Sequence, residues 1–178
     1  MSTARLDIAT LNAMDQADFV KALGDIYEYA GWVAEAAAPL RPFASRDELA
    51  AALARIVRDA DLALQMALLR AHPELGKRGP LAPESASEQR ERGIDQLAAE
   101  EAGRLAALNA AYRERFGFPF IIAVRGQPDM ATIMAALERR LSGTAHEERR
   151  IALAEVDKIA GFRLARRIST PADPEHVS

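Results

Sequence analysis

Apolar residues recur at helical spacing along almost the whole chain, and prolines and glycines interrupt them at only a few points. Phe19, Leu23, Ile26 and Ala30 follow one another at i, i+4, i+7 and i+11. This spacing places them on one face of a helix that begins after Asp15. The prolines of PLRPF end the segment, because proline cannot continue a helical hydrogen-bond ladder. The periodicity predicts an all-α fold.

Further helices are predicted at regular intervals after this one. Ser45 and Glu48 form a Ser-x-x-Glu capping box that marks a helix start. The next apolar helical stretch ends where Pro73 follows His72. A loop rich in glycine and proline comes next, and Gly117 then has the position of a left-handed C-terminal cap. The loop is expected at residues 72–84, and the helices after it at about 88–116, 129–142 and 145–168.

The stretch FPFIIAVRG, residues 118–126, differs from the rest of the chain. It is a short β-branched apolar run bounded by Pro119 and Gly126, which predicts an extended and buried segment. We therefore expect a single-domain helical bundle over residues 1–168, with residues 118–126 as a buried extended connection. Residues 169–178, which include the acidic DPEHVS, are expected to form a disordered tail.

The composition excludes several classes of protein. A net charge of −3 leaves no basic surplus for nucleic acid. The absence of cysteine excludes disulfides, thiolate zinc sites and a cysteine nucleophile, and three scattered histidines argue against a metal site. There is no apolar run of about 18 residues that could span a membrane. The N-terminus lacks the apolar core of a signal peptide, so a cytoplasmic location is expected.

His72 is the first residue that could carry chemistry, and two interpretations are open. Pro73 pushes the preceding residue out of the α region, so His72 can simply end a helix. Alternatively, leaving the helix directs the imidazole into a cleft beside the loop, where its ordinary pKa near 6.5 suits acid/base catalysis. Ser85 and Glu88 have the same ambiguity: they form a capping box, yet the carboxylate could face His72 across the loop.

Two arginines and the phenylalanine-rich run are the remaining candidates. Arg125 ends the apolar run, and Arg163 lies near the border of the apolar stripe of the last helix. Arginines usually occupy a solvated or salt-bridged face, but a forked guanidinium also suits a carboxylate or ureido group. The phenylalanines can simply fill the core, while the irregular buried backbone beside them carries N–H and C=O groups that a polar ligand could satisfy.

Several of these stretches together resemble a known family. RPFASRDEL, RAHPELGKR, SASEQRERGIDQL, LNAAYRERFGFPFIIAVRG and EVDKIAGFRL occur in the order seen in the 2-oxo-4-hydroxy-4-carboxy-5-ureidoimidazoline (OHCU) decarboxylases of urate breakdown. The resemblance extends from about Phe19 to Leu164. It implies an all-α fold, a homodimer, no cofactor, and conversion of OHCU to (S)-allantoin with loss of CO2.

The resemblance also implies roles for particular residues. His72 matches the family's catalytic histidine, and Glu88 its glutamate in the same pocket. The residues that it places against the substrate are Pro73, Ser85, Gln89, Arg125, Arg163 and the backbone of Phe120, Ile121 and Ile122. In OHCU the carboxylate lies beside a ring C=N that can accept the electron pair left by decarboxylation. The enzyme then needs to position the substrate and transfer a proton.

Two other functions are compatible with the sequence. One is a non-catalytic helical binding module, in which His72 only ends a helix and Ser85 and Glu88 only cap one. The other is a related lyase or hydrolase that acts on a different ureido compound. The surroundings of His72 distinguish the binding module from an enzyme, because a structural histidine needs neither a cleft nor a carboxylate neighbour.

Overall fold

A computed structural model describes residues 5–76 and 97–171 of the chain. The predicted helix start at Ser85 and Glu88, and Gln89 beside it, lie outside these ranges. The chain divides into two compact units. The terminal unit comprises residues 1–61 and 157–178, and the central unit comprises residues 62–156.

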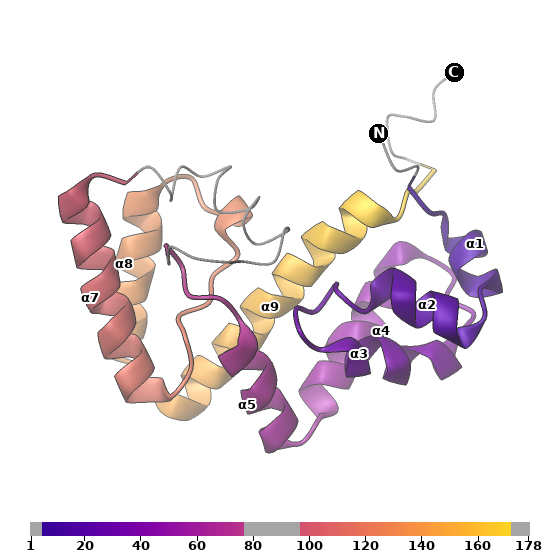
Figure 1. Cartoon of the computed structure of the whole chain (residues 1–178), viewed down its shortest axis with the longest axis horizontal. Helices are drawn as coiled ribbons and strands as arrows, with labels where there is room; N and C mark the ends of the chain where they lie inside the picture. Colours follow the sequence, from indigo (N-terminus) through magenta and orange to yellow (C-terminus); the bar gives the residue numbers. More distant parts are fainter. Residues whose placement is uncertain (1–4, 77–96, 172–178) are drawn as a thin grey trace. The chain divides into compact units, whose positions relative to one another are not determined.

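The terminal unit consists of short helices and the second half of the last helix (Figure 1). Its elements are α1 (Ile8–Ala13), α2 (Gln16–Leu23), α3 (Gly31–Ala37), the 3-10 helix η1 (Ala38–Leu40), α4 (Arg46–Asp59) and part of α9 (Ala145–Arg167). Side-chain caps begin several of them. Asp15 accepts a hydrogen bond from Asp18 N at 2.8 Å, and Ser45 accepts one from Glu48 N at 3.1 Å, as the capping box predicts.

The helix predicted to run from Asp15 toward PLRPF is interrupted, so this prediction was wrong in its extent. The helix α2 ends at Leu23 and α3 begins only at Gly31. Between them Tyr29 has a φ of 57°, which a continuous right-handed helix does not allow. The interruption is held by α9: the Tyr27 hydroxyl donates to Asp157 at 2.7 Å. Tertiary contacts therefore override the local helical pattern here.

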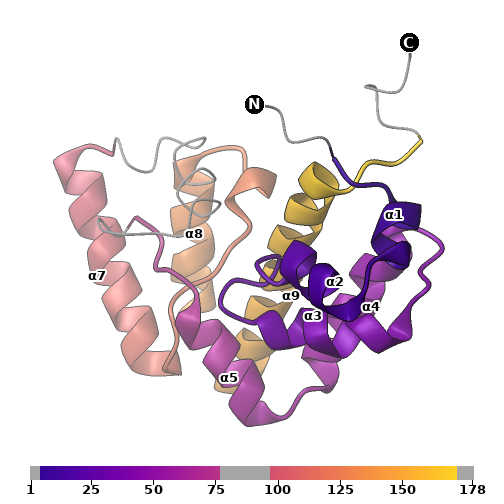
Figure 2. The ribbon, with the colours of Figure 1, turned by 45° about the vertical axis from the view of Figure 1, so that its right-hand side comes forward.

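The central unit contains α5 (Leu62–Ala71), α7 (Ala99–Phe116), the 3-10 helix η3 (Val124–Gly126), α8 (Met130–Arg140) and the first part of α9. Both views show α7 and α8 side by side (Figures 1 and 2). Gly117 ends α7 with a φ of 77°, as its position in the sequence predicts. The rings of Phe116, Phe118 and Phe120 pack around Tyr112, with centroid distances of 4.7, 5.8 and 5.4 Å.

The all-α prediction is confirmed: the described residues contain helices and no strand, with one isolated bridge between Leu6 and Ile168. The segment after Gly117 is buried and extended as far as Ala123. Its last three residues differ from the prediction, because Val124–Gly126 form a 3-10 turn. In the part of the chain that the structure describes, no helix is long and apolar enough to cross a membrane. The division into one domain and a tail stays a prediction.

Candidate active site

His72 lies immediately beyond the last residue of α5, which ends at Ala71. Its N–H donates to the Leu69 carbonyl at 3.3 Å, a single tight turn before Pro73 diverts the chain. The side chain is half-buried. The interpretation of His72 as a helix terminator is therefore confirmed, and it is compatible with an imidazole that meets a ligand.

The C-terminal half of α7 holds the chain on both sides of His72. Before it, Arg70 Nε donates to the Gly117 carbonyl at 3.1 Å. After it, Glu74 pairs with Arg113 at 2.9 Å, and the Leu75 carbonyl accepts from the Asn109 amide at 2.8 Å. The segment that carries His72 is thus tied to α7 at two points and to its C-cap residue, Gly117, at a third.

The extended segment that follows α7 is fixed by two charged side chains. Arg140 Nη1 donates to the Ile121 carbonyl at 2.8 Å, and Glu155 accepts from the Ala123 N–H at 2.8 Å. Among the hydrogen bonds of the described residues, none involves the N–H of Ile121 or of Ile122. Because both residues are at least nine-tenths buried, these amides are suited to bind an oxygen atom of a ligand.

Arg140 also belongs to a buried polar network. Its Nε donates to Glu148 at 2.9 Å, and the Tyr112 hydroxyl donates to the same carboxylate oxygen at 2.6 Å. Burial, followed by the hydrogen bond to Glu148, raises the pKa of Tyr112 well above its ordinary value, so the hydroxyl remains a proton donor. The guanidinium lies 4.6 Å from the centroid of the Phe120 ring. The network gives residues 118–123 a rigid support.

Sequence reasoning missed Arg140, Glu148 and Glu155, all of which are buried. They occupy inward positions of α8 and α9 among apolar neighbours, yet charged residues in an amphipathic helix are normally assigned to the solvent face. The spacing of Glu148 and Glu155, which is i to i+7, was the available signal that both lie on one stripe.

Arg163 belongs to the terminal unit and is buried more deeply than its place at the border of the apolar stripe predicts. Only 3% of its side chain is exposed, and its Nη2 donates to Glu28 Oε2 at 3.2 Å. Glu28, also missed, lies in the segment between α2 and α3. A guanidinium fixed in this way presents a planar, forked set of N–H donors, the geometry that suits a carboxylate or ureido group.

The remaining predicted site residues lie partly within and partly outside the described ranges. Arg125 is exposed, within η3 rather than at the end of a strand. The segment with His72 and Pro73 and the segment with Phe120, Ile121 and Ile122 belong to one unit, where α7 joins them. Ser85, Glu88 and Gln89 lie outside the described residues, so their positions stay predictions. Within the described ranges, no group of three histidine or carboxylate side chains could hold a metal ion.

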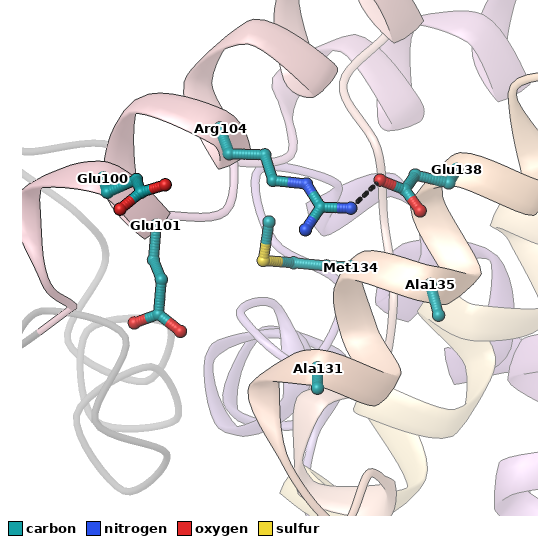
Figure 3. A pocket seen from close by; sticks show the side chains of 7 residues that line it. All are labelled: Glu100, Glu101, Arg104, Ala131, Met134, Ala135 and Glu138. Carbon is teal, nitrogen blue, oxygen red and sulfur yellow. Dashed lines mark hydrogen bonds and ion pairs between the residues drawn. The ribbon is translucent and has the colours of Figure 1, made fainter.

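A pocket of about 230 Å³ lies between α7 and α8 in the central unit (Figure 3). Glu100, Glu101 and Arg104 of α7 line it, together with Met134 and Glu138 of α8. Arg104 forms an ion pair with Glu138 across it. None of the predicted site residues lines this pocket, and its acidic groups do not match an anionic substrate, so it is not assigned to the active site.

Comparisons with known proteins agree with the resemblance found in the sequence. A family model described as OHCU decarboxylase matches residues 12–165. The 2-oxo-4-hydroxy-4-carboxy-5-ureidoimidazoline decarboxylase of Haloferax volcanii is 46% identical over 166 residues, which are 93% of this chain and 98% of that protein. The uric acid degradation bifunctional protein PucL of Bacillus subtilis is 40% identical over 155 residues, which are 87% of this chain and 31% of that protein.

Two solved structures share the fold. The crystal structure of an (S)-allantoin synthase matches with a TM-score of 0.77 and 34% identity over 93% of this chain, which spans 55% of that protein's chain. The crystal structure of an OHCU decarboxylase in the presence of (S)-allantoin matches with a TM-score of 0.65 at 22% identity, over 86% of this chain and 97% of that one. By the family model and by the length of its match to the relative from Haloferax volcanii, this chain belongs to the OHCU decarboxylase family.

Proposed function

We propose that this protein decarboxylates OHCU to (S)-allantoin in urate degradation, with His72 as the general acid/base. The observation that carries the proposal is the position of His72. The imidazole leaves the end of α5 half-buried, and α7 holds the chain on both sides of it. A histidine that only ended a helix would not require these anchors. Family membership over residues 12–165 supports the reaction.

The chemistry requires a proton transfer and no external electron acceptor. Loss of CO2 breaks the bond between the carboxylate carbon and the ring carbon, and the released electron pair moves into the adjacent C=N of the substrate. The nitrogen of that bond takes up a proton, the hydroxyl loses its proton and becomes a carbonyl, and the carbon that bears the ureido group is protonated on one face, which sets the configuration of allantoin. His72 either accepts the proton of the substrate hydroxyl or donates a proton to the ring carbon that bears the ureido group. We therefore propose that the reaction is cofactor-independent.

The other residues bind and orient the substrate. Glu88 orients the imidazole or the ureido group, and Ser85 and Gln89 contact the ligand beside it. The guanidinium of Arg163, fixed by Glu28 at 3.2 Å, binds a carboxylate or carbonyl oxygen. Pro73 walls the site, Arg125 contributes a second positive charge, and the segment Phe120–Ile122 supplies backbone N–H groups supported by Arg140. Positioning of the substrate by such contacts lets only one face of the reacting carbon receive the proton.

The test uses freshly generated OHCU and follows allantoin by circular dichroism, which reports both the rate and the handedness of the product. His72→Ala should lose about 10²- to 10⁴-fold in turnover, the usual contribution of acid/base catalysis. His146→Ala is the matched control, because His146 is an exposed histidine near the start of α9. Unchanged turnover in His72→Ala would remove His72 from the mechanism. Racemic product at the spontaneous rate with the unmodified protein would refute the activity itself.

We further propose that the protein is a cytoplasmic homodimer, with residues 1–168 as its single domain. Family membership supports the dimer and the location. Sedimentation velocity of the purified protein should give the mass of two chains of 19.4 kDa each. A single species with the mass of one chain would contradict the dimer.

A further inference from the structure

A buried amide interrupts the apolar face of α7. Leu105, Asn109, Tyr112 and Phe116 are the buried residues of this helix, at i, i+4, i+7 and i+11. Asn109 stands among leucine and aromatic side chains on this face, and only 1% of it is exposed. A buried polar side chain costs free energy unless it is hydrogen-bonded, so its contacts require an explanation.

The amide makes one hydrogen bond and leaves its other polar atom unused. Nδ2 donates to the Leu75 carbonyl at 2.8 Å. The Oδ1 atom is buried and accepts no hydrogen bond from the described part of the chain. An unsatisfied buried acceptor offsets much of what one hydrogen bond contributes to stability. Stability alone is therefore a poor explanation for this amide.

The accepting carbonyl lies in the segment that leaves His72. Leu75 is 6% exposed and follows His72 by three residues, and Gly76 after it has a φ of 74°. Three residues before His72, the Leu69 carbonyl accepts the His72 N–H. The imidazole is thus carried on a short stretch of chain whose two ends are fixed, one by α5 and the other by Asn109.

We propose that Asn109 is a positioning residue for His72. By fixing the Leu75 carbonyl it sets the path of the chain between α5 and Gly76, and with it the direction in which the imidazole points. Arg113, one helical turn further along α7, reinforces this path through Glu74. The segment Phe120–Ile122 follows α7 in the chain, and the Phe120 ring packs on Tyr112 of the same helix at 5.4 Å. The catalytic consequence rests on the proposed role of His72.

Asn109→Leu is the decisive variant, because leucine has the same number and branching of side-chain heavy atoms as asparagine and lacks the polar groups. We expect kcat to fall by about 10- to 100-fold, since a displacement of ~1 Å at a catalytic group has an effect of this size. KM should stay within about threefold, because substrate contacts made by other residues are retained.

The chain offers a matched control in its other unit. The side chain of Asn12 donates from Nδ2 to the Phe43 carbonyl at 2.8 Å, the same kind of bond at the same distance, and its Oδ1 also accepts from the Phe43 N–H at 2.9 Å. Asn12→Leu removes both bonds to Phe43, in a segment that carries no predicted site residue. It should lower the melting temperature while kcat and KM stay at the values of the unmodified protein.

A second readout is independent of activity. The chain has three histidines, so the NMR signals of the imidazole carbon-bound protons are few and can be assigned with His72→Ala and His146→Ala. Asn109→Leu should move the signals of His72 and leave those of His146 in place. Asn12→Leu should move neither. This measurement holds even if His72 proves not to be catalytic, so failure of the positioning role and failure of the catalytic role are distinguishable.

Two results would overturn the proposal. One is a lowered melting temperature in Asn109→Leu with kcat and the His72 signals unchanged, which would make the bond purely structural. The other is a fall in kcat with the His72 signals unchanged, which would place the effect of Asn109 elsewhere. If Asn109→Leu does not fold at the assay temperature, Asn109→Ala replaces it, because it removes the same donor and adds no bulk.

Discussion

Replacing Arg140 by methionine tests how the support beneath the candidate site is built. Arg140 is 8% exposed, and its guanidinium donates to the Glu148 carboxylate, to the Ile121 carbonyl and to the Tyr112 hydroxyl. Methionine preserves much of the apolar stem against Phe120 but removes every one of these donors. The carboxylate of Glu148, which is 1% exposed, would remain buried with the Tyr112 hydroxyl as its partner.

The magnitude follows from the cost of an uncompensated buried charge. Removing one partner of a buried ion pair costs roughly 3 to 5 kcal/mol, which is a large part of the roughly 5 to 15 kcal/mol that holds a protein folded. For a chain of this length the loss corresponds to roughly 6 to 20 °C in melting temperature. Activity should fall as well, because the Ile121 carbonyl loses its donor and the segment Phe120–Ile122 loses its anchor.

The assay is urea unfolding followed by circular dichroism at neutral pH, for Arg140→Met alone and combined with Glu148→Gln. The double variant should be less destabilised than Arg140→Met, because glutamine removes the buried charge while its carbonyl still accepts from Tyr112. A loss below about 1 kcal/mol for Arg140→Met would refute this reasoning, since it would mean that water or another cation compensates Glu148. A double variant less stable than the single one would refute it too.

Three further outcomes are expected. Burial raises the pKa of Asp157, so its ionised form is disfavoured in the folded protein. The free energy of unfolding therefore falls as the pH rises through the raised pKa. Asp157→Asn should raise the melting temperature at pH 7, by a margin that disappears at about pH 3. Gly117→Ala places a side chain at a φ of 77° and should cost roughly 1 to 2 kcal/mol in chemical unfolding. Ser45→Ala removes the cap of α4 and should cost about 1 kcal/mol in the same assay. The role of Asp157 would be contradicted if Asp157→Asn melted below the unmodified protein at pH 7. The roles of Gly117 and Ser45 would be contradicted if Gly117→Ala or Ser45→Ala left the free energy of unfolding unchanged.

Local chemistry explains why much of the fold could be predicted from the sequence. Ser45 caps α4 by accepting from Glu48 N, Gly117 takes the left-handed conformation that glycine allows, and Pro73 follows the end of α5 so that His72 lies outside the helix. Each of these residues affects only the backbone a few positions away, so its effect can be read from neighbouring residues in the sequence. Helix ends of this kind can be predicted without knowledge of the partner elements.

The interruption between α2 and α3 could not be predicted, because its causes are distant in the sequence. The spacing of Phe19, Leu23, Ile26 and Ala30 suits one continuous helix, and all four are buried as the pattern requires. The backbone nevertheless leaves the helix after Leu23, and Tyr27 bonds to a residue 130 positions away. A periodic pattern reports which side chains are buried, but it does not report whether the backbone between them is regular.

The candidate site shows the same limit in its charged residues. Glu148, Glu155 and Arg163 follow one another on α9 at i, i+7 and i+15, close to a single stripe of the helix. A charged stripe in an amphipathic helix normally predicts the face toward water. Here all three are buried, because each has a specific partner: Arg140 for Glu148, the Ala123 N–H for Glu155, and Glu28 for Arg163. The partners lie 8, 32 and 135 residues away, so no local pattern contains them. A charge becomes stable in the interior only through such a partner, and for that reason the sequence singled out neither Glu148 nor Glu155 and placed Arg163 only near the border of the apolar stripe.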